Sequence, residues 1–329
     1  MKRAVSAVLF VILFAAVGYL FWVTRPVACL AKSASDTAAA VSGDSVRIIE
    51  RTVVPASPRI PEVPAFMVFA GDTIRFDRFD LRERMDRELI AFTYGHTNSL
   101  LMLKRSARIF PQIEPLLAQN GVPDDLKYLM AIESNLSETA VSVAGAAGLW
   151  QFMREVGKEY GLEVAPTVDE RYHIQKETVA ACSYLKKAHA RFGNWMTVAA
   201  SFNGGINGIT RRRETQRQSN ALDLYLVEET SRYMFRILVA KMMFENPELF
   251  GFELEERDLY PYIPPKQKVK VSESIEDLAE FAGRYGISYA QLRRANPWLR
   301  DTKLVAAKGK TYEILIPDIE AERQYLLHL

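Results

Sequence analysis

The chain has 329 residues, a formal net charge of +2 and a hydrophobic content of 49%. This length allows two domains, and this composition lets most of the chain bury a core. So small a net charge gives no overall field that would select nucleic acid as a partner. Cys29 and Cys182 lie far apart, and the four histidines have no metal-ligand spacing, so we expect neither a disulfide framework nor a metal or other cofactor.

Residues 1–26 are predicted to be an N-terminal membrane anchor or signal segment. Lys2 and Arg3 precede residues 4–23, an uncharged stretch about as long as a helix that crosses a bilayer. Positive charge before the stretch favours a cytoplasmic N-terminus and export of the rest of the chain. We expect an uncleaved anchor; cleavage as a signal peptide and lipidation of Cys29 are the alternatives. All three place the body of the protein outside the cytoplasm.

Residues 27–79 are predicted to form an extended tether. The segment 27–65 is rich in Ala, Ser, Thr, Val and Pro, and its prolines recur at positions 55, 58, 61 and 64. Prolines at this density are unfavourable for helices and sheets alike.

Residues 80–255 are predicted to form a compact all-helical domain. Segments such as "SLLMLKRSARIFPQIEPLLAQNG" and "RYMFRILVAKMMFENP" repeat apolar residues at helical intervals. Glycines at 121, 161, 193 and 251 fall where these helices should end. A domain of this size folds independently.

Residues 266–319 are predicted to form a small α+β module after the boundary marked by Pro264 and Pro265. "KVKVSES" alternates like a strand, "SIEDLAEFAGRYG" and "SYAQLRRANPWL" indicate two short helices, and "KTYEILIP" alternates again. The expected order is therefore β-α-α-β, so the predicted fold class is a mainly α domain with a small α+β module.

Glu133 occupies a position where its helix should present an apolar side chain. Leu126, Leu129 and Met130 precede it by seven, four and three residues, which places all four on one helix face. A surface acid is the simpler interpretation, because Glu is common on helices. A partly buried carboxyl, however, has a raised pKa and can donate a proton near neutral pH.

Two glycine-containing segments complete the candidate site. "SVAGAAGLWQFM" is consistent with an ordinary turn between helices, but its small residues also allow the backbone to approach a ligand. Trp150, Gln151 and Met153 would then offer the mixed apolar and polar contacts that suit a sugar. In "ASFNGGINGI", Asn203 precedes two glycines and can present an amide to a polar ligand, although a simple helix end is the alternative.

Taken together, these motifs resemble the lytic transglycosylases of the soluble-lytic-transglycosylase, goose-type-lysozyme-like group. The resemblance extends over about residues 80–252, and "VDERYH", "AACSYL" and "FGNW" resemble the membrane-bound lytic transglycosylase D branch. The matching motifs are Glu133-Ser134, Ser142, "GAAGLWQFM", "SFNGG" and "EETSRY" ending at Tyr233. Residues 266–319 resemble a LysM glycan-binding module through "LRRANPWL" and "YEILIP", although "SESIEDL" replaces the usual opening; a purely stabilising appendage is the alternative.

The resemblance implies a lysozyme-like fold and a lyase that cleaves the bond between N-acetylmuramic acid (MurNAc) and N-acetylglucosamine (GlcNAc), forming 1,6-anhydroMurNAc ends. Glu133 would be the single catalytic carboxyl. Ser142 and Tyr233 would orient it and the muramic acetamide, and Gln151 and Asn203 would hold the sugars. Glu138, Asp169 and Glu170 are weaker candidates for helper acids. The family's usual tyrosine is Phe202 here, so any hydrogen bond made by that hydroxyl must be absent or replaced.

The predicted setting is the periplasmic face of the cell envelope. The expected partners are peptidoglycan glycan strands and, through the N-terminal segment, the membrane, with other cell-wall enzymes as further candidates and no nucleic acid. Two alternative functions remain: a lysozyme-like muramidase on the same fold, in which water attacks, and a catalytically silent peptidoglycan-binding protein, which Phe202 favours and Glu133 with Gln151 disfavours.

Overall fold

The computed structural model describes residues 60–327. The predicted anchor, Cys29 and most of the predicted tether lie outside these residues. Within them, no helix is both long enough and apolar enough to span a bilayer.

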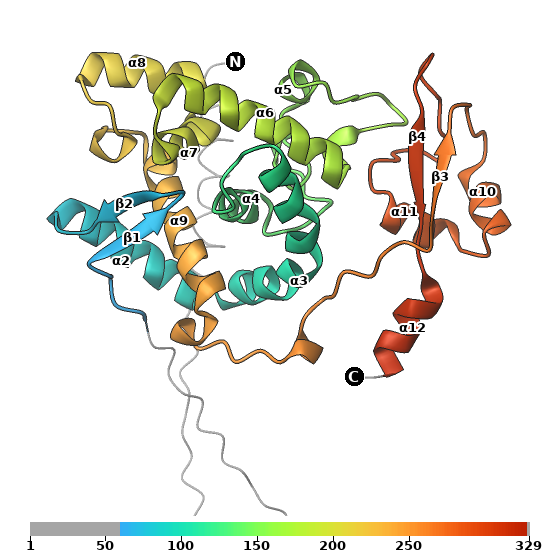
Figure 1. Cartoon of the computed structure of the whole chain (residues 1–329), viewed down its shortest axis with the longest axis horizontal. Coiled ribbons are helices and arrows are strands. Elements are labelled where there is room, and N and C mark those ends of the chain that lie inside the picture. The colour runs from blue at the N-terminus through green and yellow to red at the C-terminus, as the bar shows by residue number, and fades with distance from the viewer. Residues whose placement is uncertain (1–59, 328–329) are drawn as a thin grey trace, which may run out of the picture. The chain divides into compact units, whose positions relative to one another are not determined.

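Helices dominate residues 79–258 (Figure 1). Their bounds are α2 Phe79–Tyr94, α3 His96–Gln119, α4 Leu126–Ser134, α5 Arg154–Glu159, α6 Ile174–Phe192, α7 Trp195–Gly204, α8 Ile206–Gln216 and α9 Glu228–Glu245. Short 3₁₀ helices are η1 Glu170–Tyr172, η2 Ala221–Asp223, η3 Pro247–Phe250 and η4 Glu256–Asp258. The mainly α class predicted from the sequence is confirmed.

The long helix α9 organises the core, because it packs against α2, α4 and α7, while α3 packs against α4 and α6. Its sequence makes this possible: apolar residues surround much of α9, including Met234, Phe235 and Leu238, and all three are fully buried. The short helix α4, which carries Glu133, is therefore held between α3 and α9.

A β-hairpin precedes the helices, and it corrects one predicted boundary. Strands β1 (Phe66–Phe69) and β2 (Asp72–Arg75) pair antiparallel around Ala70-Gly71. Phe69 and Ile74 join the apolar core of the helical domain, so this part of the predicted tether of 27–79 is folded against that domain. The prolines up to position 64 obscured the alternation in "FMVFAGDTIRF", where Ala70 and Gly71 both adopt the positive φ of the turn, at 51° and 90°.

The C-terminal module has the predicted β-α-α-β order: β3 Gln267–Val271, α10 Leu278–Arg284, α11 Tyr289–Ala295 and β4 Tyr312–Ile316. Strands β3 and β4 pair antiparallel, with Val269 opposite Ile314. Buried Leu278, Leu292 and Ile314 give the module a core of its own. A further helix, α12 Ile319–Leu327, follows it and was not predicted.

The segment 163–172 of the helical domain contacts this module. Val168 forms a β-bridge with Leu299, and the N–H of Arg300 donates to the carbonyl of Thr167 at 2.9 Å. Val168 and Tyr172 belong to the module's apolar cluster. The side chains of Lys310 and Tyr312 hydrogen-bond to the Glu163 carboxylate at 2.6 and 2.9 Å. This contact ties the module to a segment that also supports the candidate site.

Candidate active site

Glu133 lies in the last turn of α4, where the core meets the surface. Leu126, Leu129 and Met130 are fully buried, as their spacing predicted, whereas Glu133 is only partly buried. The helix ends directly afterwards, because Asn135 adopts a left-handed conformation with φ of 50°. The same apolar row that anchors the helix thus delivers one carboxyl to the edge of the core.

The Glu133 carboxyl has one close hydrogen-bond partner among the described residues, the phenol of Tyr233 on α9. The Tyr233 hydroxyl donates to Glu133 Oε1 at 2.5 Å, across 100 residues of sequence. Burial raises the pKa of Glu133 to about 7; the Tyr233 hydrogen bond and the charge of Arg236 oppose this rise, and the nearby charge of Glu229 adds to it. The result is a carboxyl that is half protonated near neutral pH.

Ser142 and Gln151 lie in the loop that follows α4, and their hydrogen bonds lie within that loop. Ser142 Oγ accepts from the N–H of Ala146 at 3.0 Å. Gln151 Nε2 donates to the carbonyl of Gly148 at 2.8 Å, and Gln151 itself has a positive φ of 50°. Within residues 60–327, neither side chain hydrogen-bonds to Glu133. The left-handed backbone of Gln151, a residue other than glycine, is strained, and such strain is often found at binding sites.

Gly148 lets this loop approach the segment behind it. With φ of 82°, a Cβ at this position would lie 1.6 Å from the carbonyl oxygen of Arg171 and 2.4 Å from a carboxyl oxygen of Glu177. Any larger residue would push the loop outward. The glycine that the sequence motif contains is therefore needed for a close approach to protein, in addition to any approach to ligand.

Three side chains, those of Glu177, Thr178 and Arg171, hold the loop from its inner side. Fully buried Glu177 accepts the N–H of Trp150 at 3.2 Å, and Thr178 Oγ1 accepts from the Trp150 indole at 3.0 Å. Burial raises the pKa of Glu177 well above its ordinary value. Arg171 donates to the carbonyls of Gly145 at 2.8 Å and Phe152 at 3.0 Å. These contacts fix both ends of the segment that contains Gln151.

The three predicted helper acids contact cations, and within residues 60–327 none of them hydrogen-bonds to Glu133. Asp169 forms a buried ion pair with Arg171 at 2.7 Å. Glu170 pairs with Lys176 and Lys310, at 2.5 and 2.8 Å. Glu138 lies 3.7 Å from Arg108. These contacts occupy the three carboxyls with cations, and their role as helpers of Glu133 stays a prediction.

Phe202, the departure from the family pattern, is surrounded by aromatic rings. It lies within 6.3 Å, centroid to centroid, of Trp150 and Phe152, and edge-on to Tyr184 at 5.1 Å. Tyr184 donates to the carbonyl of Ser201 at 2.8 Å. The Tyr184 hydroxyl therefore lies on the ring next to Phe202, the position at which the family's usual tyrosine is missing.

Asn203 lies next to Phe202 at the end of α7 and faces α9. Its Oδ1 accepts from Thr230 Oγ1 at 2.7 Å, and its Nδ2 lies 3.4 Å from Glu229 Oε1. Met153 is 44% exposed at the start of α5, where it is open to a ligand. Asn203 and Glu133 are thus both hydrogen-bonded to α9: Asn203 to Thr230, and Glu133 to Tyr233 one turn later.

Sequence reasoning did not single out four residues that shape this site: Tyr184, Glu177, Glu229 and Arg236. Glu229 stood inside the quoted "EETSRY" motif, and its charge acts on Glu133. Residues three and four apart share a helix face, so Arg236 could have been found from its spacing to Tyr233. Tyr184 stood inside the quoted "AACSYL" motif, whereas only tertiary packing places Glu177 at the loop. No cluster of three or more His, Cys, Asp or Glu able to hold a metal occurs within residues 60–327.

Two family models match the chain. The model described as "Transglycosylase SLT domain" matches residues 112–224, which include Glu133, the loop and Asn203. The model described as "Soluble lytic transglycosylase C-terminal LysM-like domain" matches residues 267–320. The chain carries a transglycosylase SLT domain. A LysM-like domain follows it, so the predicted resemblance is confirmed for both parts.

Curated proteins extend the similarity beyond these two domains. The membrane-bound lytic murein transglycosylase D of Escherichia coli (strain K12) is 25% identical over 263 residues, 78% of this chain and 56% of that protein. A putative tributyltin chloride resistance protein of Alteromonas sp. (strain M-1) is 29% identical over 111 residues, 32% of this chain and 54% of that protein. The chain thus spans little more than half the length of these relatives.

A solved structure gives a weaker likeness. This is the lytic transglycosylase Slt inactive mutant E503Q from Pseudomonas aeruginosa, at 19% identity and a TM-score of 0.36. The match covers 46% of this chain and 26% of that one.

Proposed function

We propose that the protein is a peptidoglycan lytic transglycosylase that cleaves the MurNAc-β-1,4-GlcNAc bond and leaves a 1,6-anhydroMurNAc end. The observation that carries this proposal is the Glu133 carboxyl, which receives a hydrogen bond from Tyr233 and has a pKa raised by burial to about 7. A carboxyl with this pKa is suited to give up a proton and to take one back within one catalytic cycle.

In the proposed reaction, Glu133 protonates the glycosidic oxygen, and the bond from MurNAc C1 to that oxygen breaks. GlcNAc leaves with a free 4-hydroxyl. The Glu133 carboxylate then removes the proton of the MurNAc C6 hydroxyl, whose oxygen bonds to C1. The proton returns to Glu133 and no water is consumed, so one carboxyl is sufficient, whereas most glycosidases need two.

The other site residues have proposed roles around this carboxyl. Tyr233 holds Glu133 through the hydrogen bond from its hydroxyl, and Ser142 helps to orient Glu133 and the muramic acetamide. Gln151 and Asn203 hold sugar hydroxyls or amides, while Met153 and Phe202 supply apolar contact.

A lysozyme-like muramidase is the second candidate, and Glu229 is the observation that favours it. Its charge is near enough to raise the pKa of Glu133, and its carboxylate lies beside the Asn203 amide. A second carboxylate at a site edge can activate water as a general base. A catalytically silent wall-binding protein is disfavoured by the raised pKa of Glu133, because such a protein has no need of a tuned acid.

The proposed substrate also suggests where the protein acts. A relative named as membrane-bound, together with the positively flanked apolar segment 4–23, supports a site at the periplasmic face of the cell envelope. We propose that the LysM-like domain adds glycan contacts to the same strand and so raises the effective substrate concentration.

Mass spectrometry of the fragments released from purified sacculi tests the reaction. A transglycosylase gives muropeptides that end in anhydroMurNAc, lighter by one water than the reducing ends from a muramidase. Anhydro ends lost in Glu133→Gln and retained in Glu229→Gln support the proposal. Reducing ends that are lost in Glu133→Gln and also in Glu229→Gln would instead establish a muramidase. If the folded wild-type protein releases no fragments, the catalytically silent binding protein is the function that remains.

A further inference from the structure

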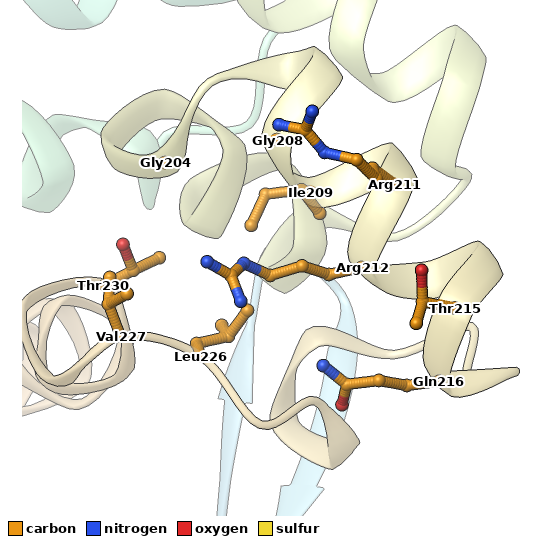
Figure 2. Close-up of a pocket in the computed structure, with 10 residues that line it drawn as sticks. All are labelled: Gly204, Gly208, Ile209, Arg211, Arg212, Thr215, Gln216, Leu226, Val227 and Thr230. Carbon is orange, nitrogen blue, oxygen red and sulfur yellow. The ribbon is translucent and has the colours of Figure 1, made fainter.

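A cavity of about 470 Å³ lies between α8 and the start of α9, outside the residues assigned to the sugars. Arg211 and Arg212 of α8 line it on one side, and Leu226, Val227 and Thr230 line it on the other. Figure 2 shows the Arg212 side chain extending from α8 toward this second wall.

The charge inside the cavity is unbalanced. The described residues that line it include two arginines and no acidic residue. The acids at the start of α9 are engaged elsewhere, since Glu228 pairs with Arg87 at 2.5 Å and Glu229 contacts Asn203. Arg211 is exposed and Arg212 is partly buried, so two positive charges without an acidic neighbour in the lining attract an anion.

The cavity adjoins the candidate active site through α9. Thr230, which lines the cavity, donates its hydroxyl hydrogen bond to Asn203. Tyr233, which binds Glu133, follows Thr230 by three residues, about one helical turn or ~5 Å along the axis. Gly204 follows Asn203 and also lines the cavity. A Cβ at Gly204 would lie 3.2–3.4 Å from side-chain atoms of Ile209 and Thr230.

The chemistry of the lining indicates an anion attached to an apolar chain. Guanidinium groups bind carboxylates in a paired, bidentate manner. The buried side chains Ile209 and Leu226, with the half-exposed Val227, offer apolar contact beside the two charges. A fixed anion next to aliphatic groups is found in a short peptide that carries free carboxylates.

We propose that this cavity binds a carboxylate of the stem peptide that is attached to the muramic lactyl group of the substrate. This inference rests on the proposed function. An extended peptide advances about 3.3–3.6 Å per residue, so two or three residues span ~10 Å, which exceeds the ~5 Å of one helical turn between Tyr233 and Thr230 of the cavity lining. The cavity would favour cleavage of strands that still carry their peptides.

The test compares one glycan strand in two forms: with its stem peptides, and after an amidase has removed them. The measured quantity is the ratio of the cleavage rate on the first form to the rate on the second. In the double variant Arg211→Gln, Arg212→Gln we expect this ratio to fall at least tenfold, as for a lost hydrogen bond to a charged group. Arg217→Gln is the matched control, because it removes the same kind of charge from the end of α8, where Arg217 lines a neighbouring hollow.

A second arm separates a peptide carboxylate from other anions. Soluble muropeptides, with their carboxylates either free or converted to amides, are titrated into Glu133→Gln, which binds without cleaving. We expect the free acids to bind at least tenfold more tightly than the amides, and this difference to disappear when Arg211 and Arg212 are also changed.

Several outcomes would overturn the inference. One is an unchanged rate ratio in the double variant; another is equal binding of free and amidated muropeptides; a third is a ratio that falls equally in Arg217→Gln. A wild-type protein that cleaves neither strand would instead refute the proposed function. Anhydro ends on both strands, with no dependence on the arginines, would leave that function standing and remove only this inference.

Discussion

Glu133 and Glu170 are both withdrawn from solvent, yet the protein moves their pKa values in opposite directions. Burial raises the pKa of Glu133 to about 7, because its opposing partners are one phenol and one more distant arginine. Burial acts on Glu170 as well, but hydrogen bonds from Lys176, Lys310 and the N–H of Glu163 outweigh it and lower the pKa. Burial alone therefore does not make a catalytic acid; the strength of the cationic partners beside the carboxyl decides the direction.

The two carboxyls also differ in what surrounds them. Glu133 is only partly buried, and its close partner is the Tyr233 phenol, which leaves it accessible to a ligand. Glu170 faces the LysM-like domain, with Lys310 supplied by that domain at 2.8 Å. We infer that one site is arranged for proton transfer and the other for holding two parts of the chain together, and substitutions at each carboxyl should separate these roles.

The largest expected effect is on catalysis. Glu133→Gln should lower the rate of glycan cleavage by about 10³-fold or more while the fold is retained, because an amide cannot donate the proton. Release of muropeptides from sacculi measures the rate, and circular dichroism checks the fold. Glu138→Gln is the matched control, a partly buried carboxyl of raised pKa that lies near Arg108. A folded Glu133→Gln variant with more than a few percent of wild-type activity would contradict the assignment.

The next effect is on stability, and its sign depends on pH. The folded-state pKa of Glu133 is raised above the ordinary 4.5, so its contribution to stability is fully present below about 4.5 and is lost as pH rises through about 7. Relative to Glu133→Gln, the wild type should lose about 3 kcal/mol of unfolding free energy across this interval. Urea unfolding at pH 5 and pH 8 measures the difference, and two parallel pH dependences would show that Glu133 is not tuned by burial.

A smaller effect with the opposite pH sign is expected at Glu170. Glu170→Gln should lower the unfolding free energy by about 2 kcal/mol at pH 7, because Lys176 and Lys310, each about one-third exposed, lose a buried partner. The lowered pKa means that this contribution is present above the unfolded-state pKa and is lost as pH falls through the folded-state value. Cleavage per folded molecule should be unaffected.

The control for Glu170 is Glu155→Gln, which removes an exposed pair with Lys158 and should change stability by well under 1 kcal/mol. Equal effects at the two positions, measured by urea unfolding, would mean that the Glu170 contacts are no stronger than a surface ion pair.

The smallest effect concerns Phe202. Phe202→Tyr adds a hydroxyl among Trp150, Phe152 and Tyr184, so we expect a cost of about 1–2 kcal/mol in stability and a lower turnover. We expect the Tyr184 hydroxyl to occupy the space that the added hydroxyl needs. The double variant Phe202→Tyr, Tyr184→Phe should therefore recover part of the lost stability and part of the lost turnover. Thermal unfolding and turnover measure this, and a clear gain in turnover with an unchanged melting temperature would prove the expectation wrong.

Local patterns were enough to predict the helical class, the β-α-α-β module and the buried row Leu126, Leu129 and Met130. Helical and strand periodicities are properties of neighbouring residues, which is why they can be read from a sequence. The hairpin at 66–75 escaped because its strands have only four residues each and follow a proline-rich stretch.

The partners of Glu133 could not be read from periodicity. Tyr233 lies 100 residues away and was identified only through the family resemblance. The raised pKa of Glu133 and the lowered pKa of Glu170 depend on which charges tertiary packing brings near, so the sequence alone could not separate the acid from its proposed helpers. Phe202 was recognised as a departure, but the Tyr184 ring beside it was not.

The pH dependence of kcat/KM on a soluble glycan strand tests the central claim most directly. If Glu133 must enter the reaction protonated, with a pKa of about 7, log kcat/KM should fall with a slope of −1 above about pH 7. Tyr233→Phe removes a hydrogen bond that lowers this pKa, so its fall should begin at a higher pH. A wild-type profile that is flat through pH 8, or that already declines from pH 4.5, would contradict the account.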